Sequence, residues 1–238
     1  MPSILITGCS QGLGHALSIV FAEKGYDVYA VGRNQKLLAE LGRLSPNIHP
    51  IVADIATEQG RDFIGKEVRI QDHFSIIHNA AIAVPCSFEP LSEGLLRSHF
   101  EANFFAPLLI TQMLLPQLPP ETKILHISSG AAHLALPGLT PYCLSKGALD
   151  HLTACLNAEL EKKKIYCANL YPGVIDTKMQ EGLRLAPVDI LPGKDFYVQS
   201  ARENKLARAE DVAKFVASIM LETSGPDFVT TRWAFGVL

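Results

Sequence analysis

Cysteine is scarce in this sequence, and the few cysteines have none of the spacings that bind metals or form redox pairs. The 238 residues contain five cysteines, an odd number, and no C-x-x-C pair. The eight histidines form no H-E-x-x-H cluster, and His151 with Cys155 offers only two ligands, too few for a zinc site. We therefore expect free thiols, a reducing compartment such as the cytoplasm, and no bound metal.

The sequence also lacks a secretory signal, a membrane span and a strong net charge. Pro2 is followed almost at once by a short apolar run, without the basic and long apolar segments that a signal requires. No apolar stretch is long enough to cross a bilayer. The net charge is -3 and the longest like-charged block is 162–164, so no basic surface is expected for nucleic acid or anionic lipid. These absences predict a cytoplasmic protein whose partner is a small molecule.

What the sequence does contain is an alternation of apolar, strand-like runs with helical patterns. Several runs are apolar throughout, as strands covered on both faces are, and the alternation indicates βαβ units. We predict strands at Ile4–Ile6, Asp27–Val31, Ile48–Val52, Ser75–His78, Lys123–Ile127, Ile165–Leu170 and Phe228–Thr230. The expected fold is an α/β, Rossmann-type doubly wound parallel sheet of about seven strands with helices on both faces. Residues 1–238 would form it as one domain.

One segment interrupts the alternation. Residues 178–207 follow the sixth strand and carry Pro187, Pro192 and Gly193, so they cannot form a single helix. A segment at the carboxyl end of a strand is well placed to act as a substrate loop or lid. The alternative is an ordinary surface excursion.

A glycine-rich turn follows the first predicted strand and opens the first helix. Glycines permit a tight turn and a close backbone approach to a pyrophosphate, and the unpaired N–H groups of a helix start favour an anion. In this setting the pattern predicts a dinucleotide site, with a purely structural turn as the alternative. The residues assigned to the site are Gly8, Ser10, Gln11, Gly12, Leu13 and Gly14.

The end of the second strand indicates which dinucleotide is bound. An NAD-binding protein usually places Asp or Glu there to hold the ribose 2′-hydroxyl. This chain has Gly32 and Arg33 instead, and arginine suits a phosphate. We therefore predict NADP(H) rather than NAD(H). The residues expected to flank the adenosine side are Asp54, Ile55, Asn79 and Ala80.

Tyr142 and Lys146 lie four residues apart in a predicted helix and so share one face. A cation about 4 Å from a phenolate, at an effective dielectric of about 20, is worth on the order of 4 kcal/mol. This attraction could lower the pKa of the tyrosine by up to roughly 3 and make it a general acid or base. The alternative is an exposed pair without function. Ser128 and Ser129 close a predicted strand, where a hydroxyl can bind a substrate oxygen.

With these residues assembled, the chain resembles the single-domain short-chain dehydrogenase/reductase family over essentially its whole length. No single motif is decisive, but together they occur in the family's order and with its spacing. They are Thr7-Gly-x-x-x-Gly-x-Gly14, Asn79-Ala80-Ala81 for the family's Asn-Ala-Gly, Asn103, Ser129, Tyr142, Lys146, Pro172-Gly173 and Thr177.

The resemblance implies a role for each matched residue. Tyr142 would donate a proton to a carbonyl oxygen that Ser129 orients, and hydride would come from the cofactor. Lys146 would lower the pKa of the tyrosine and bind the nicotinamide ribose. Asn103 would hold a water of the proton relay, and Ala81 departs from the family's glycine without removing a reactive group. Thr177 and the backbone near Ile175 would contact the nicotinamide carboxamide, and Pro172 and Gly173 are also assigned to the cofactor site.

Within the family, residues 127–132 and 172–180 resemble the sepiapterin reductase and benzil reductase branch. Sepiapterin reductases hold the pterin with an acidic residue near the carboxyl terminus. This chain has Thr230 or Thr231 there, and Asp227 would substitute only if the chain is shifted. We therefore favour NADPH-dependent reduction of a ketone or dicarbonyl to an alcohol. The alternatives are a sepiapterin reductase-like enzyme, a dehydrogenase in the oxidising direction and a non-catalytic NADP(H) sensor.

Apolar residues in the loops after the strands favour a largely apolar ketone as the substrate. The residues expected to line its site are Ala83, Val84, Pro85, His133, Leu134, Leu136, Leu139, Met179 and Leu183. Two predicted long helices, Leu95–Leu115 and Pro141–Leu160, would by family analogy pair across a two-fold axis. That analogy implies a homodimer or homotetramer.

Overall fold

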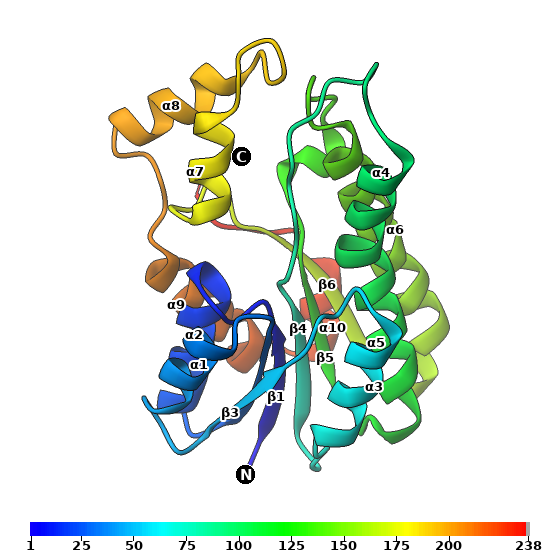
Figure 1. Cartoon of the computed structure of the whole chain (residues 1–238). Helices are drawn as coiled ribbons and strands as arrows, with labels where there is room; N and C mark the ends of the chain where they lie inside the picture. Colours follow the sequence, from blue (N-terminus) through cyan, green and yellow to red (C-terminus); the bar gives the residue numbers. More distant parts are fainter. Residues whose placement is uncertain (237–238) are drawn as a thin grey trace.

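A seven-stranded parallel sheet forms the centre of the computed structural model, which describes residues 1–236. The strand order is β3-β2-β1-β4-β5-β6-β7, and Figure 1 shows the helices on both sides of the sheet. The predicted fold class is confirmed. The strands are β1 (Ser3–Thr7), β2 (Asp27–Gly32), β3 (Ile48–Val52), β4 (Phe74–His78), β5 (Lys123–Ile127), β6 (Tyr166–Tyr171) and β7 (Trp233–Ala234).

Both faces of the sheet are buried because the strands carry apolar side chains at successive positions. In β1, Ile4 and Ile6 join the core on one face, Leu5 joins the core on the other, and all three are fully buried. Helices α1 (Gly12–Glu23), α2 (Gln35–Gly42) and α9 (Ala209–Glu222) cover the first face. Helices α3 (Glu58–Glu67), α5 (Ala106–Leu114) and α6 (Thr140–Leu160) cover the second. No helix within residues 1–236 is long and apolar enough to cross a membrane.

The prediction of a strand at Phe228–Thr230 is wrong. These residues end helix α10 (Gly225–Thr230), which Ser224 caps by accepting a hydrogen bond from the backbone N–H of Asp227. Pro226 lies in the first turn of the helix, where a missing N–H costs nothing. The last strand follows as the two-residue β7. The β-branched and aromatic residues of this segment resemble a strand, but the cap and the proline favour a helix.

The predicted helix Leu95–Leu115 is also interrupted. It consists of α4 (Glu93–Phe100), a π-helical turn (Glu101–Phe105) and α5. Within the turn, the N–H of Ala106 donates to the carbonyl oxygen of Glu101, five residues back. Pro107 explains the change of pattern, since it lacks the N–H that a regular helix would use to bond the carbonyl of Asn103.

Residues 178–202 lie beyond the carboxyl ends of the strands. They form α7 (Lys178–Leu185) and α8 (Lys194–Arg202), and the predicted breakers Pro187, Pro192 and Gly193 fall between the two helices. Figure 1 shows both helices at the end of the molecule opposite the N-terminus. The strand order reverses between β1 and β4, which is where open α/β sheets bind ligands.

Candidate active site

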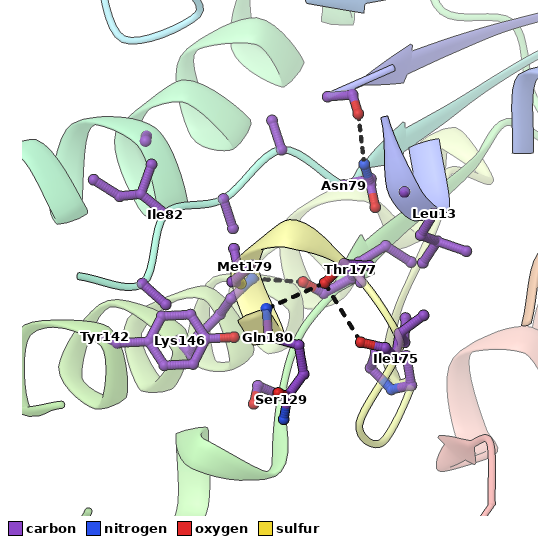
Figure 2. A pocket seen from close by; sticks show the side chains of 18 of the residues that line it. Leu13, Asn79, Ile82, Ser129, Tyr142, Lys146, Ile175, Thr177, Met179 and Gln180 are labelled. Atoms are coloured by element: carbon purple, nitrogen blue, oxygen red, sulfur yellow. Dashed lines mark hydrogen bonds between the residues drawn. The ribbon is translucent and has the colours of Figure 1, made fainter. Parts of the chain in front are cut away.

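The carboxyl ends of the strands open into a cleft of about 1030 Å³. Its floor consists of the segments that follow β1, β2, β3, β4, β5 and β6, and its cover is the α7–α8 segment, residues 178–202. Figure 2 shows Tyr142 and Lys146 on one helix, Ser129 near them, and Thr177 with Gln180 at the start of α7. All residues assigned to cofactor or catalysis line this cleft, except Gly14 and Asn103.

In the glycine loop after β1, backbone segments lie too close together for side chains at the glycine positions. Gly8 and Gly12 have φ angles of 79° and 60°, which favour glycine. A Cβ at Gly14 would lie 2.3 Å from the carbonyl oxygen of Gly8, so Gly14 shapes the loop from behind the cleft. At the start of α1, the side chain of Gln11 caps no N–H and the first turn holds no acidic residue. This uncapped helix start fits an anion such as a pyrophosphate.

Asn79 ties the glycine loop to the end of β4. Its Nδ2 donates to the carbonyl oxygens of Thr7 (2.8 Å) and Gly8 (3.3 Å). In return, the backbone N–H groups of Asn79 and Ala80 both donate to Oγ1 of Thr7 at 3.1 Å. These bonds fix the two strand ends on either side of the point where the strand order reverses.

At the end of β2, the Ser10 side chain occupies the space that an acidic side chain at position 32 would need. A Cβ at Gly32 would lie 2.4 Å from Oγ of Ser10. The next residue, Arg33, has a side chain that is 70% exposed, and its Nη1 lies 3.9 Å from Oδ2 of Asp54. A guanidinium at the rim of the cleft fits a phosphate on the adenosine ribose.

Burial changes the pKa of Tyr142 in the direction opposite to the sequence-based expectation. Loss of hydration raises it to about 12, against the smaller lowering effect of a hydrogen bond with Ser129. The ammonium of Lys146 is hydrogen-bonded elsewhere: its Nζ lies 5.9 Å from the centroid of the Tyr142 ring and donates to the carbonyl oxygen of Ile127 at 2.6 Å. Burial also lowers the pKa of Lys146 to about 8. The expectation of a lysine-acidified phenol considered only the pair and not its desolvation.

Asn103 and His99 hold the backbone of the loop after β4. The amide of Asn103 accepts from the N–H of Ile82 (2.8 Å) and donates to the carbonyl of Ile82 and to Oγ of Ser145. Both N–H groups of this amide are thus occupied, and the predicted water at Asn103 stays a prediction. His99 was missed by the sequence reasoning; its Nε2 accepts from the N–H of Val84. Its spacing of one helical turn from Asn103 was the available signal.

The segment after β6 brings Thr177 against the glycine loop. Its Cγ2 would lie 3.1 Å from a Cβ at Gly12. Oγ1 of Thr177 accepts from the N–H of Gln180 and so caps α7, and Figure 2 shows the contact between the two residues. Gly173 turns the chain with a φ of 69°. Residues 172–177, which include those assigned to the carboxamide, therefore lead directly into α7, the first helix of the cover.

The remaining part of the cleft is lined mainly by apolar side chains. Of the nine residues predicted to meet the substrate, Val84, Pro85 and His133 do not line the cleft. His133 instead lies 3.2 Å from Asp150. The sequence reasoning missed Phe196 and Tyr197 of α8, whose helix it left unassigned. The predicted residues that do line the cleft are Ala83, Leu134, Leu136, Leu139, Met179 and Leu183.

Known proteins resemble this chain in sequence and fold. The sequence profile of the short chain dehydrogenase family matches residues 2–187. An L-xylulose reductase of Caenorhabditis elegans is 33% identical over 74% of this chain and 72% of its own length. A benzil reductase ((S)-benzoin forming) of Bacillus cereus is 27% identical over 92% of this chain and 94% of its own length. The crystal structure of the KRED1-Pglu enzyme has a similar fold, with a TM-score of 0.88 at 24% identity over 98% of this chain and 100% of that chain.

Proposed function

Because the chain belongs to the short chain dehydrogenase family, we propose that it is an NADPH-dependent oxidoreductase that reduces an apolar ketone or dicarbonyl to an alcohol. The observation that carries this proposal is the convergence of Ser129, Tyr142 and Lys146 in the cleft that the glycine loop also lines. The similarity to a benzil reductase over nearly the whole chain supports the same substrate class.

The floor of the cleft fits a nicotinamide dinucleotide. The glycine loop and the uncapped start of α1 suit the pyrophosphate, and Arg33 suits a phosphate on the adenosine ribose. The contact between Ser10 and the Cβ position of Gly32 disfavours the carboxylate that would select NAD(H). When bound, the dinucleotide supplies the hydride.

Tyr142 is the proton donor in this proposal. With a pKa of about 12, its phenol is protonated at neutral pH, and the alkoxide that forms from a ketone is a stronger base than a phenolate. Proton transfer from the phenol to the alkoxide is therefore favourable. Ser129 orients the carbonyl oxygen, and Lys146 binds the nicotinamide ribose.

A dedicated pterin enzyme is less well supported. The oxygen Oδ2 of Asp227 accepts a hydrogen bond from Oγ of Ser224 at 2.6 Å, at the start of α10. None of Asp227, Thr230 and Thr231 lines the cleft. The apolar side chains near Tyr142 instead suit a ketone with bulky hydrocarbon substituents.

The decisive test is NADPH oxidation with a panel of ketones, diketones, sugars and sepiapterin, run for the wild type and for Tyr142→Phe. We expect reduction of apolar ketones or diketones, and a loss in kcat of roughly 10² to 10⁴-fold in the variant. The affinity for NADPH, measured by calorimetry, should be unchanged. Tyr197→Phe, at another tyrosine that lines the cleft, is the matched control and should keep most of the activity.

The alternatives give different results in the same assay. NADPH binding without turnover of any compound would indicate a sensor protein. Preferential turnover of sepiapterin would indicate the pterin enzyme. Faster reaction of alcohols with NADP⁺ than of ketones with NADPH would indicate the oxidising direction, and equal use of NADH would contradict the cofactor assignment.

We also propose that the protein assembles as a homodimer or homotetramer through the surfaces of α4, α5 and α6. Phe105, at the junction with α5, is 40% exposed, and Leu144 of α6 is 54% exposed. Burial of such side chains at a symmetric interface would stabilise the assembly. Light scattering should show particles of at least twice the 25.9 kDa mass of the chain, and particles of 25.9 kDa alone would contradict the proposal.

A further inference from the structure

Asp150 is an acidic residue with no role so far, and it lies one helical turn after Lys146 on α6. Its side chain is only 11% exposed. One carboxylate oxygen accepts from Oγ of Ser128. The other accepts from the hydroxyl of Tyr171 at 2.8 Å and lies 3.2 Å from Nε2 of His133. A largely buried carboxylate that accepts several hydrogen bonds is held in one position.

The donors to Asp150 come from the segments that build the floor of the cleft. Ser128 precedes Ser129, and Tyr171 precedes the Pro172–Gly173 turn. His133 ends the short turn (Gly130–His133) that follows Ser129. A single carboxylate on the helix of Tyr142 and Lys146 therefore joins the ends of β5 and β6 to that helix.

The charge of Asp150 also acts on Lys146. Lys146 is 2% exposed, and the nearby Asp150 carboxylate opposes the lowering of its pKa by burial. Among the other groups facing Lys146, Tyr142 on the same helix is protonated, and His126 of β5 has its pKa lowered to about 3. Around Asp150 itself, the pKa of Tyr171 is raised to about 12, so the Tyr171 hydroxyl keeps the proton that it donates to Asp150. The guanidinium of Arg232 lies over the Tyr171 ring, 5.1 Å from its centroid.

We propose that Asp150 is a positioning residue for the reaction: its carboxylate holds the Ser128–Ser129 segment and the end of β6 against α6 and balances the charge of the Lys146 ammonium. This role rests on the proposed function, because it concerns the same site. It assigns no contact between Asp150 and the substrate.

The test compares Asp150→Asn with the wild type by NMR titration of the lysine side chains in the protein without cofactor or substrate. Removing the anion disfavours the ammonium, so the pKa of Lys146 should fall by on the order of 1. In the ketone reductase assay, the loss of activity on raising the pH should then begin about one pH unit lower in the variant. Glu159→Gln removes an exposed acid from the same helix and should change neither the titration nor the pH profile.

Ser128→Ala and Tyr171→Phe test the positioning part, because each leaves the carboxylate charge in place. Each should lower kcat several-fold without moving the titration of Lys146, and both keep the proposal testable if Asp150→Asn does not fold. An unchanged Lys146 titration in folded Asp150→Asn would overturn the charge role. Wild-type kcat in both hydroxyl variants would overturn the positioning role. If the wild type reduces no carbonyl, the proposed function fails, while the titration still reports on Asp150.

Discussion

The glycine loop in the floor of the cleft and helix α7 in its cover differ in how tightly the chain is packed. In the floor, backbone segments approach so closely that a Cβ at Gly14 would lie 2.3 Å from a carbonyl oxygen. In the cover, a Cβ at Gly182 of α7 would meet nothing within 4 Å. The floor satisfies its polar groups internally, as Asn79 does, whereas the cover exposes Leu185 and Phe196 at 76% and 60%. From this difference we expect the floor to fix the positions of the reacting groups and the cover to select among substrates.

The largest difference between floor and cover is expected when one glycine in each region is replaced by alanine, which adds one methyl group. Gly14→Ala forces the glycine loop away from Gly8, and overpacking against backbone costs about 1–3 kcal/mol, so NADPH affinity should fall up to about 100-fold. Gly182→Ala should leave NADPH affinity unchanged and stabilise α7 by about 0.5–1 kcal/mol. Calorimetric titration with NADPH measures the affinities, and thermal unfolding measures the stabilities. Equal NADPH affinities in the two variants would contradict the contrast.

A smaller effect is expected at the rim of the floor. Arg33→Ala removes a charge-assisted contact worth about 1.5 kcal/mol, the low end of the usual range because the side chain is 70% exposed. The KM for NADPH should therefore rise about 10-fold while the KM for NADH stays the same. Protein stability should not change, since the pair with Asp54 is long and exposed. Lys36→Ala, at an exposed position on the following helix, is the control. Steady-state kinetics with NADPH and with NADH measures both KM values. A parallel rise in the two values would refute phosphate recognition by Arg33.

The smallest effect is expected in the cover. Phe196 lines the cleft and is exposed, so an apolar substrate can bury part of its ring, at about 25 cal/mol per Å². Phe196→Ser should raise the KM for apolar ketones about five-fold with little change in kcat or in NADPH affinity. Leu185→Ser, at a more exposed position that does not line the cleft, should have no effect. If kcat rather than KM falls in Phe196→Ser, the cover takes part in positioning the reacting groups and the contrast with the floor is weakened.

The fold was largely predictable because its strands are apolar on both faces. Runs such as Lys123–Ile127 are short, continuous and separated by helical patterns, so both their type and their parallel arrangement follow from the sequence. The final strand was not predictable in this way. Phe228 is fully buried in a helix as it would be in a strand, and the helix depends on local signals at Ser224 and Pro226 that are weaker than the apolar pattern.

The parts of the site that depend on the spacing of residues along the sequence were predictable. The parts that depend on burial by distant segments were not. Tyr142 and Lys146 share a helix face, so their presence in one cleft follows from the sequence. The direction of the pKa shift at Tyr142 does not, because desolvation depends on segments far along the chain. His99, Asp150 and Phe196 escaped notice for the same reason: their partners are distant in sequence, and each residue type is common at positions without function.

The contact between Ser10 and the Cβ position of Gly32 constrains how this chain could evolve. An acidic residue at position 32 would displace the Ser10 hydroxyl, which also accepts a hydrogen bond from the N–H of Asn34 at 3.4 Å. An acidic residue at position 32 therefore requires the Ser10 side chain to rotate or to be replaced. Substitutions at positions 10 and 32 are thus coupled in any descendant of this chain.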